Sequence, residues 1–312
     1  MTSSKDSRPA TLVIGATGRH GRTGARVVEQ LLSHGHNVRV LTRSTGVHTD
    51  AAARLGAGIV VGDLLDRRTL GAVVDGVDHV YFTYPIAAGA LSAAANLASV
   101  LRAAKLSPRL VVMSMGVSMP DSPSALGREQ WMAEEALSWA GLEPVVLRFR
   151  ALFHENIRLL HGPSIRANGR FANNFGAGRV PWIGGRDAAD LAVAALVDPD
   201  RYPAGTISYP MGVELLSHGE IADLIAAEIG SPVEYTTISR EAWRAEWDAG
   251  SDGVINPAMA QHISAIGESF SAPRPGAPAP EFDPRAVAAD IGRAPMTFAE
   301  FLRANRDEFA RG

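Results

Sequence analysis

The residues that most clearly suggest a chemistry are four glycines, spaced three apart, between an apolar run and a helical pattern. They are Gly15, Gly18, Gly21 and Gly24. Residues 12–14 before them read as a short strand, and residues 25–32 repeat apolar side chains at helical spacing. Glycine lets the backbone turn tightly against a pyrophosphate, and the N-terminus of a helix offers free N–H groups to that anion. The arrangement predicts a site for the phosphates of a dinucleotide.

Within this loop, we expect Gly15, Thr17 and Gly18 to bind the cofactor. Arg19 and His20 are further candidates, because both side chains can form charge-assisted hydrogen bonds with phosphate oxygens. Two solvated loop side chains are an equally good interpretation of that pair.

The residue after the second predicted strand, residues 37–42, bears on the choice of dinucleotide. A site that prefers NAD places Asp or Glu near this point for the ribose hydroxyls. Residues 42–44 read Thr-Arg-Ser and contain no acid. Because Arg43 can bind a 2′-phosphate, we expect NADPH or NADP+ as the cofactor. The alternative is an arginine on the open surface.

The first half of the chain alternates predicted strands and helices. Strands are expected at residues 12–14, 37–42, 59–61, 79–83, 109–114 and 144–149. Repeated β–α units with short connections imply a parallel sheet with helices on both faces, and such sheets bind ligands at the carboxyl ends of their strands. We therefore predict an α/β fold with a doubly wound parallel sheet.

The second half is less regular. Residues 161–178 are rich in Gly and Asn and are expected to form a loop, and the proline-rich residues 271–283 are expected to be a linker. Ser217 and Thr297 each precede a glutamate by three residues, which is capping-box spacing and predicts a helix start. This half reads as a lid or substrate region.

Composition excludes several classes of function. The 312 residues are 46% hydrophobic and 20% charged, with a formal net charge of −3, which provides no basic field for nucleic acid or an anionic membrane. The absence of cysteine rules out disulfides, thiolate metal sites and cysteine nucleophiles. The nine histidines show no paired ligand spacing, so no metal is expected. We expect a cytoplasmic protein without a membrane segment.

Five motifs occur in an order that resembles a known family. They are Gly15-Ala-Thr-Gly18, Gly62-Asp63, Leu147-Arg148, Phe153-His-Glu-Asn156 and the terminal residues 292–301. Together they are similar to the NmrA-like branch of the atypical short-chain dehydrogenase/reductases, over nearly the whole chain. The resemblance implies a Rossmann domain, expected at residues 1–156, and a smaller C-terminal α/β substrate lobe at residues 157–312, with segments that return to the Rossmann sheet.

The sequence departs from this family pattern at two places. Residues 19–21 look inserted between the first glycine pair and the apolar face of the helix, so either the loop bulges over the pyrophosphate or the helix starts a turn early. The helix expected at residues 126–140 also lacks the Tyr-x-x-x-Lys pair of typical short-chain dehydrogenases. This branch often lacks that pair.

The resemblance also suggests further cofactor contacts. Asp63, with Leu64 beside it, is similar to the position that meets the adenine amino group, although a local turn or helix cap is the alternative. Thr83 and Pro85 flank the point where the chain would pass the riboses of the cofactor. Pro85 is also consistent with a residue that only ends its strand.

The candidates for catalysis are Ser114, Tyr84, Gln130 and His154. Ser114 ends the fifth predicted strand, where typical relatives carry a catalytic serine, and a plain hydroxyl at a strand end is the alternative. The other three are candidates to donate a proton or orient a substrate carbonyl, and each also has a structural interpretation. We expect Glu134 and Glu135 to lie on a solvated helix face.

The first hypothesis is an NADPH-dependent oxidoreductase that reduces a small apolar quinone, enone or imine by hydride transfer. Without a Tyr–Lys pair, an acceptor that needs little acid catalysis by the protein is favoured. The alternative is a non-catalytic NADP(H)-binding redox sensor. A nucleotide-sugar epimerase or dehydratase is disfavoured, because those reactions need the tyrosine base. The expected partner is a small-molecule substrate, and the assembly state is left open between a monomer and a homodimer.

Overall fold

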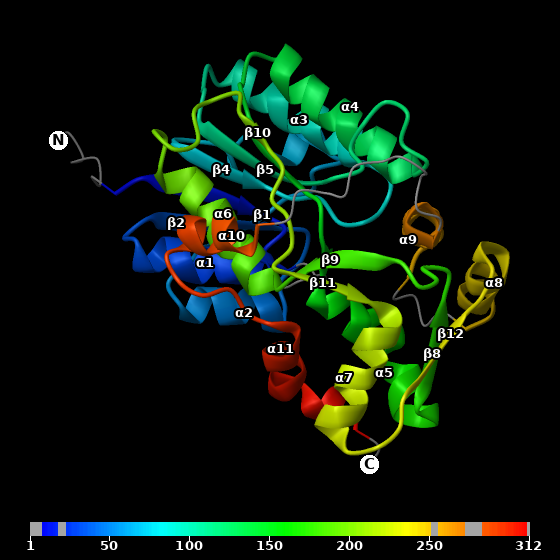
Figure 1. Cartoon of the computed structure of the whole chain (residues 1–312). Helices are drawn as coiled ribbons and strands as arrows, with labels where there is room; N and C mark the ends of the chain where they lie inside the picture. The colour runs from blue at the N-terminus through cyan, green and yellow to red at the C-terminus, as the bar shows by residue number, and fades with distance from the viewer. Residues whose placement is uncertain (1–7, 18–22, 251–254, 272–282, 311–312) are drawn as a thin grey trace.

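A computed structural model describes residues 8–17, 23–250, 255–271 and 283–310. Its centre is a parallel sheet in the order β10-β6-β5-β4-β1-β2-β3 (Figure 1). The strands are β1 (Ala10–Ile14), β2 (Asn37–Thr42), β3 (Gly58–Val61), β4 (His79–Phe82), β5 (Arg109–Met115), β6 (Val145–Phe149) and β10 (Ile207–Ser208). The order reverses between β1 and β4, which is the topological switch point of a Rossmann sheet. The predicted doubly wound α/β fold is confirmed.

Helices cover both faces of this sheet. One face carries α1 (Thr23–Ser33), α2 (Val47–Arg54), α6 (Gly185–Val197) and α10 (Pro284–Ile291), and the other carries α3 (Ala90–Ala103) and α4 (Ala125–Trp139). Successive side chains of β5 alternate between the two cores: Val111 packs with the α1 and α6 side, and Val112 packs with the α3 and α4 side. Apolar strands buried on both sides are typical of parallel sheets.

The second half builds a smaller lobe beside the carboxyl end of the sheet (Figure 1). It holds the strands β7 (Leu152–Phe153), β9 (Arg179–Ile183) and β11 (Glu214–Ser217) in one sheet, and β8 (Arg170–Asn173) paired with β12 (Glu234–Thr237). Its helices are α5 (His154–Asn168), α7 (His218–Ile229), α8 (Arg240–Gly250), α9 (Pro257–Ser271) and α11 (Phe298–Ala304). The short 3-10 turns are η1 (Arg67–Thr69) and η2 (Arg306–Glu308). Because β10 and α6 also come from this half, the chain returns to the first sheet.

The prediction of a loop at residues 161–178 is wrong, because α5 runs through Asn168 and β8 follows it. Pro163 lies inside the helix, where proline is usually unfavourable. The helix still forms because Ile157, His161 and Ile165, four residues apart, are all buried on one face. Here tertiary packing outweighs the local preference.

Both predicted capping boxes are confirmed. The Ser217 Oγ atom accepts from the backbone N–H of Glu220, whose carboxylate accepts in turn from the Ser217 N–H at 2.8 Å. Thr297 and Glu300 make the same exchange at the start of α11. The helices α2, α9 and α10 were not expected. The proline-rich linker falls mainly on residues 272–282, outside the described part of the chain.

One ionic cluster ties the terminal segment to the sheet's helices. Arg293 contacts the carboxylates of Asp187 and Asp190 on α6, both at 2.6 Å, and Arg26 on α1 contacts Asp190 at 3.1 Å. Asp187 is fully buried and also accepts from the backbone N–H of Met296 at 2.8 Å. The segment after α10 is thereby held against α6.

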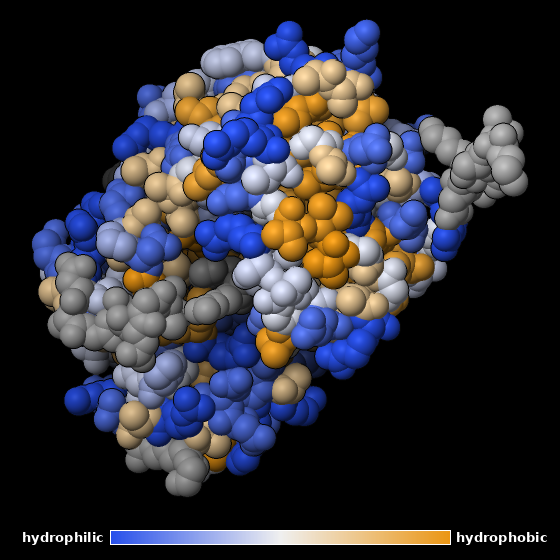
Figure 2. All heavy atoms as spheres, turned by 180° about the vertical axis from the view of Figure 1, so that it is seen from behind, coloured by the Kyte–Doolittle hydropathy of each residue, from blue (hydrophilic) through white to orange (hydrophobic). Residues whose placement is uncertain are grey.

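The surface seen from behind is mainly hydrophilic, with apolar side chains gathered in separate patches (Figure 2). None of the described helices is both long and apolar enough to cross a membrane.

Candidate functional site

Gly15 forms the turn that ends β1 and lies directly against the end of β4. Its φ of 84° is in the left-handed region, and a Cβ atom there would lie 2.3 Å from Cγ2 of Thr83. Gly24, in the first turn of α1, is also constrained, because its Cβ would lie 2.4 Å from the carbonyl oxygen of Gly15. These two glycines let β1, β4 and α1 pack closely at the switch point, as a dinucleotide site requires.

The rest of the glycine loop is only partly described. Thr17 is half-buried and lines a cavity of about 550 Å³ between the glycine turn, α1, α2 and α5. Gly18, Arg19 and His20 lie outside the described residues, so their contacts with phosphate stay predictions. The described part of α1 begins at Thr23. Gly24, after the apparent insertion, is therefore the glycine that brings α1 against β1.

Tyr84 follows β4 among charges from three other elements. Burial raises the pKa of Tyr84, the carboxylates of Asp63 and Glu129 raise it further, and the guanidinium of Arg43 opposes them. The phenol therefore stays protonated at neutral pH and can donate a hydrogen bond. Its hydroxyl is 3.5 Å from the carbonyl oxygen of Ala88. The structure thus brings Arg43, Asp63 and Tyr84, predicted separately, to one edge of the sheet.

Asp63 uses part of its hydrogen-bonding capacity locally. Its Oδ1 atom accepts from the N–H of Leu65 at 2.9 Å, and its own N–H donates to Oγ1 of Thr69 at 2.8 Å. This is the local turn left open above, and the contact with adenine stays a prediction. The carbonyl oxygen of Leu64 accepts from Asn96 at 2.8 Å, and Pro85 is exposed.

Ser114 ends β5 inside a buried polar cluster. Its hydroxyl donates to Oε1 of Glu134, and Ser118 donates to the same oxygen at 2.7 Å. The Nε and Nη2 atoms of Arg148 donate to the other oxygen, Oε2, at 2.8 and 2.6 Å. Burial alone would lower the pKa of Arg148, but the hydrogen bonds and charge of Glu134 outweigh it and raise that pKa. The cluster joins β5, β6 and α4.

The prediction that Glu134 lies on a solvated helix face is wrong, because Glu134 is only 3% exposed. Its neighbour Glu135 is half-buried. A carboxylate can be buried here since a guanidinium and two hydroxyls satisfy both of its oxygens. Gln130 lies one helical turn earlier on the same face and is also buried. Its Nε2 atom has no hydrogen-bond partner in the structure.

His154 lies apart from the other candidates. It is fully buried in the second lobe, with ring centroids 4.8 Å from Phe298 and 5.5 Å from Phe301. Neither ring nitrogen has a hydrogen-bond partner, and burial lowers its pKa to about 3. The catalytic role considered for His154 is therefore not supported, because burial among aromatic rings holds its own ring neutral.

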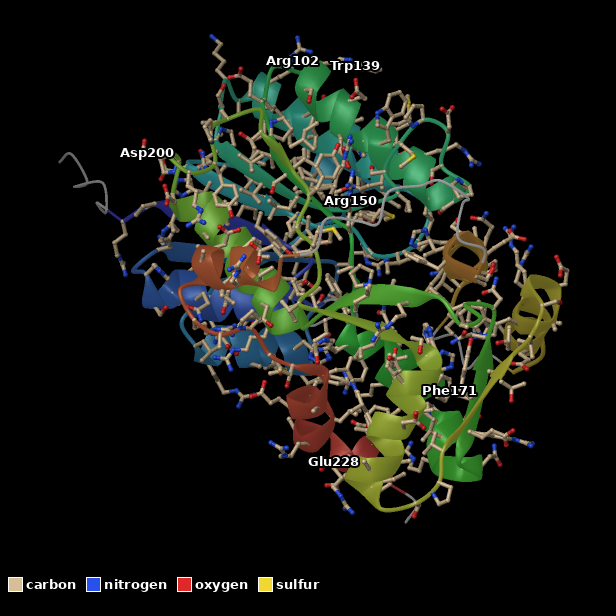
Figure 3. The ribbon with its side chains drawn as sticks, viewed as in Figure 1. Arg102, Trp139, Arg150, Phe171, Asp200 and Glu228 are labelled. Carbon is tan, nitrogen blue, oxygen red and sulfur yellow. The ribbon has the colours of Figure 1, made fainter. Side chains whose placement is uncertain are left out.

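Sequence reasoning missed the residues that surround Ser114. Glu134 and Arg148 were missed as a pair, although Arg148 interrupts the otherwise apolar strand β6, which is a usable signal. Arg150 was also missed. Its guanidinium carbon lies 4.3 Å from the centre of the Tyr209 ring, and the residue, labelled in Figure 3, is exposed. Glu129 caps α3 through the N–H of Gly89 at 2.7 Å.

Comparisons with known proteins agree with this geometry. Residues 15–159 match the NAD(P)H-binding domain family. The chain is 30% identical over 306 residues to an NAD(P)H azoreductase from Xenophilus azovorans, covering 96% of this chain and 98% of that protein.

Solved structures share the fold at lower identity. An NADPH-dependent quinone oxidoreductase from Escherichia coli, complexed with NADPH, superposes with a TM-score of 0.77 at 21% identity, covering 95% of this chain and 99% of that chain. A triphenylmethane reductase from Citrobacter sp., complexed with NADP(H), has a TM-score of 0.76 at 17% identity and the same coverage. The azoreductase, which is similar over nearly the whole chain, does not favour the sensor alternative.

The expectations of a Rossmann-type fold, an NAD(P)H cofactor and a reductase are thus confirmed. From the glycine turn at the switch point, the matching domain and the relative that spans nearly the whole chain, we conclude that this protein is an NAD(P)H-dependent oxidoreductase and belongs to the NmrA-like family of atypical short-chain dehydrogenase/reductases.

Proposed function

We propose that the protein is an NADPH-dependent reductase of small apolar acceptors of the quinone, enone, imine or azo type. The main observation in support of this proposal is the pair of side chains that α4 turns toward Ser114. The face toward Ser114 presents Gln130 and Glu134, four residues apart, where a Tyr–Lys pair would supply acid catalysis. Acceptors that take a hydride with little help from a protein acid suit this site best.

Our proposed cofactor contacts come from the ends of β1 to β4. Gly15, Thr17 and Thr83 would approach the phosphates and riboses, Arg43 the 2′-phosphate, and Asp63 with Leu64 the adenine. Gly18, Arg19, His20 and Pro85 complete the proposed set. When bound, the cofactor supplies the hydride. The chain's own part is to hold the reactants in contact, exclude water and form hydrogen bonds to them through Tyr84, Ser114 and Gln130.

Turnover is tested by following the absorbance of NADPH with a panel of quinones, enones, imines and azo compounds. We expect oxidation of NADPH with at least one class, and Ser114→Ala and Gln130→Leu should lower kcat/KM. Tight binding of NADPH without turnover of any acceptor would contradict the proposal and favour a sensor.

The preference for NADPH over NADH is proposed from Arg43. This residue is exposed at the carboxyl end of β2, and its charge acts on Tyr84, so it lies near the crevice. Arg43→Ala should weaken NADPH binding about tenfold and leave NADH binding unchanged, because only NADPH carries the 2′-phosphate. Arg54→Ala, an exposed arginine on α2, is the matched control. Equal losses for both dinucleotides would refute the assignment.

A homodimer is also proposed. Trp139 is 71% exposed and lines, with Arg102, a hollow on the outer face of α3 and α4 (Figure 3). The hollow is otherwise lined largely by alanines, which allow close approach of a second copy. Light scattering should show a dimer that Trp139→Glu dissociates. A monomeric wild-type protein at micromolar concentration would refute it.

A further inference from the structure

The hydroxyl of Ser114 has one proton, and that proton points into the buried cluster. Ser114 donates to Oε1 of Glu134, whose other oxygen accepts two hydrogen bonds from Arg148. Together with the hydrogen bond from Ser118, these contacts make both oxygens of Glu134 acceptors, so neither donates in return. The proton of Ser114 is therefore committed to Glu134.

Ser114 can then only accept from anything that approaches its free side. A serine hydroxyl carries one donor and two acceptor lone pairs, and its donor is already used. Gln130, on the same face of α4, has the opposite character: its buried Nε2 atom has no partner and is free to donate. One acceptor and one donor thus lie on neighbouring elements beside the carboxyl end of β5.

We propose that Glu134 and Arg148 are positioning residues that fix Ser114 as a hydrogen-bond acceptor, with Gln130 as the complementary donor. This inference deepens the proposed function and rests on Ser114 belonging to that site. The group that Ser114 contacts must carry an N–H or O–H. It is either the carboxamide of the nicotinamide or a hydroxyl or amine on the substrate. Ser114 is therefore not the proton donor of the reaction.

The first experimental arm measures cofactor binding without turnover. The quenching of tryptophan fluorescence gives Kd for NADPH and for its 3-acetylpyridine analogue, in which a methyl group replaces the amide nitrogen. If the carboxamide is the donor, wild type prefers NADPH by about five- to tenfold, and Ser114→Ala abolishes the preference. Because no acceptor is present, these Kd values can be interpreted even if the enzyme turns over none of the proposed substrates.

The second arm measures Kd for a hydroxylated and a methylated naphthoquinone in the presence of NADP+. If the substrate is the donor, wild type prefers the hydroxylated quinone by a similar factor, and Ser114→Ala abolishes that preference instead. The loss of either preference supports the proposal. It is overturned if wild type shows neither preference, or if Ser114→Ala leaves both unchanged.

The positioning role has its own control variants. Ser118→Ala removes a donor from the same oxygen of Glu134 and should leave both Kd ratios unchanged. The double variant Glu134→Gln/Arg148→Met removes both charges together, so the hydroxyl of Ser114 is free to rotate, and it should lose the same preference as Ser114→Ala. A double variant that keeps the wild-type ratios would show that Glu134 does not orient Ser114.

Discussion

Arg148 and Glu134 form a pair of hydrogen bonds that is almost closed to solvent. Both Nε and Nη2 of Arg148 donate to one carboxylate oxygen, and the two side chains are 11% and 3% exposed. The pair fastens β6 to α4 at the level of Ser114. It therefore supports the fold and the candidate site through the same contacts, and variants can separate the two effects.

Removing one member of this pair should lower the free energy of unfolding more than removing both members. Arg148→Met leaves a buried carboxylate without its cation, so we expect a loss of about 3–5 kcal/mol in the free energy of unfolding. The double variant Glu134→Gln/Arg148→Met should lose much less stability, because no unpaired charge stays buried. Urea denaturation gives the free energy of unfolding of both variants. Arg68→Met breaks an exposed pair with Asp66 and should leave the free energy of unfolding nearly unchanged. A double variant as unstable as Arg148→Met would contradict this account.

Gly24 tests the geometry of the glycine turn. Gly24→Ala would place a Cβ atom 2.4 Å from the carbonyl oxygen of Gly15 and 2.6 Å from Cα of Ala16, both backbone atoms that cannot move independently. We expect α1 to shift from β1 and NADPH binding to fall at least tenfold by fluorescence titration. Gly219→Ala, in a helix where the Cβ would meet only Oγ of Ser217 at 3.9 Å, should bind NADPH normally and be slightly more stable. Unchanged binding in Gly24→Ala would argue against the close packing.

Local signals account for what could be predicted from the sequence. The second strand has the predicted bounds, Asn37–Thr42, because an apolar run ends at a turn. The capping boxes at Ser217 and Thr297 were found because their chemistry lies within four residues. The glycine turn was found for the same reason. These patterns do not depend on contacts with distant parts of the chain.

What could not be predicted depends on pairs that are far apart in the sequence. Glu134 reads as an ordinary charge on a helix, and only the arrival of Arg148 and Ser114 makes its burial tolerable. The helix through Pro163 forms because a buried face outweighs a local penalty. His154 is a plausible acid in the sequence, and only the two phenylalanines from the terminal helix show that it is a core residue.

The cluster around Asp187 should contribute to stability through its burial. Arg293→Met leaves the fully buried Asp187 with only a backbone donor. We therefore expect the free energy of unfolding, measured by thermal denaturation, to fall by about 2–4 kcal/mol. Arg285→Met is the matched control: its pair with Asp283 is a surface contact in which the arginine is 90% exposed. Equal effects of the two variants would show that burial is not the cause.

His154 should make the protein sensitive to acid. Its pKa is about 3 in the folded protein and 6.5 as the ordinary value, so protons bind the unfolded chain preferentially. This contribution to stability is present above pH 6.5 and is lost as the pH falls toward 3, by about 2 kcal/mol near pH 5. His154→Phe removes the titrating ring where neither nitrogen has a hydrogen-bond partner and the neighbours are aromatic. Chemical denaturation at about pH 7.5 and pH 5 should show a smaller loss for the variant. His34→Gln, at an exposed position, should behave as wild type, and a variant that loses as much stability as wild type would show that His154 is not responsible.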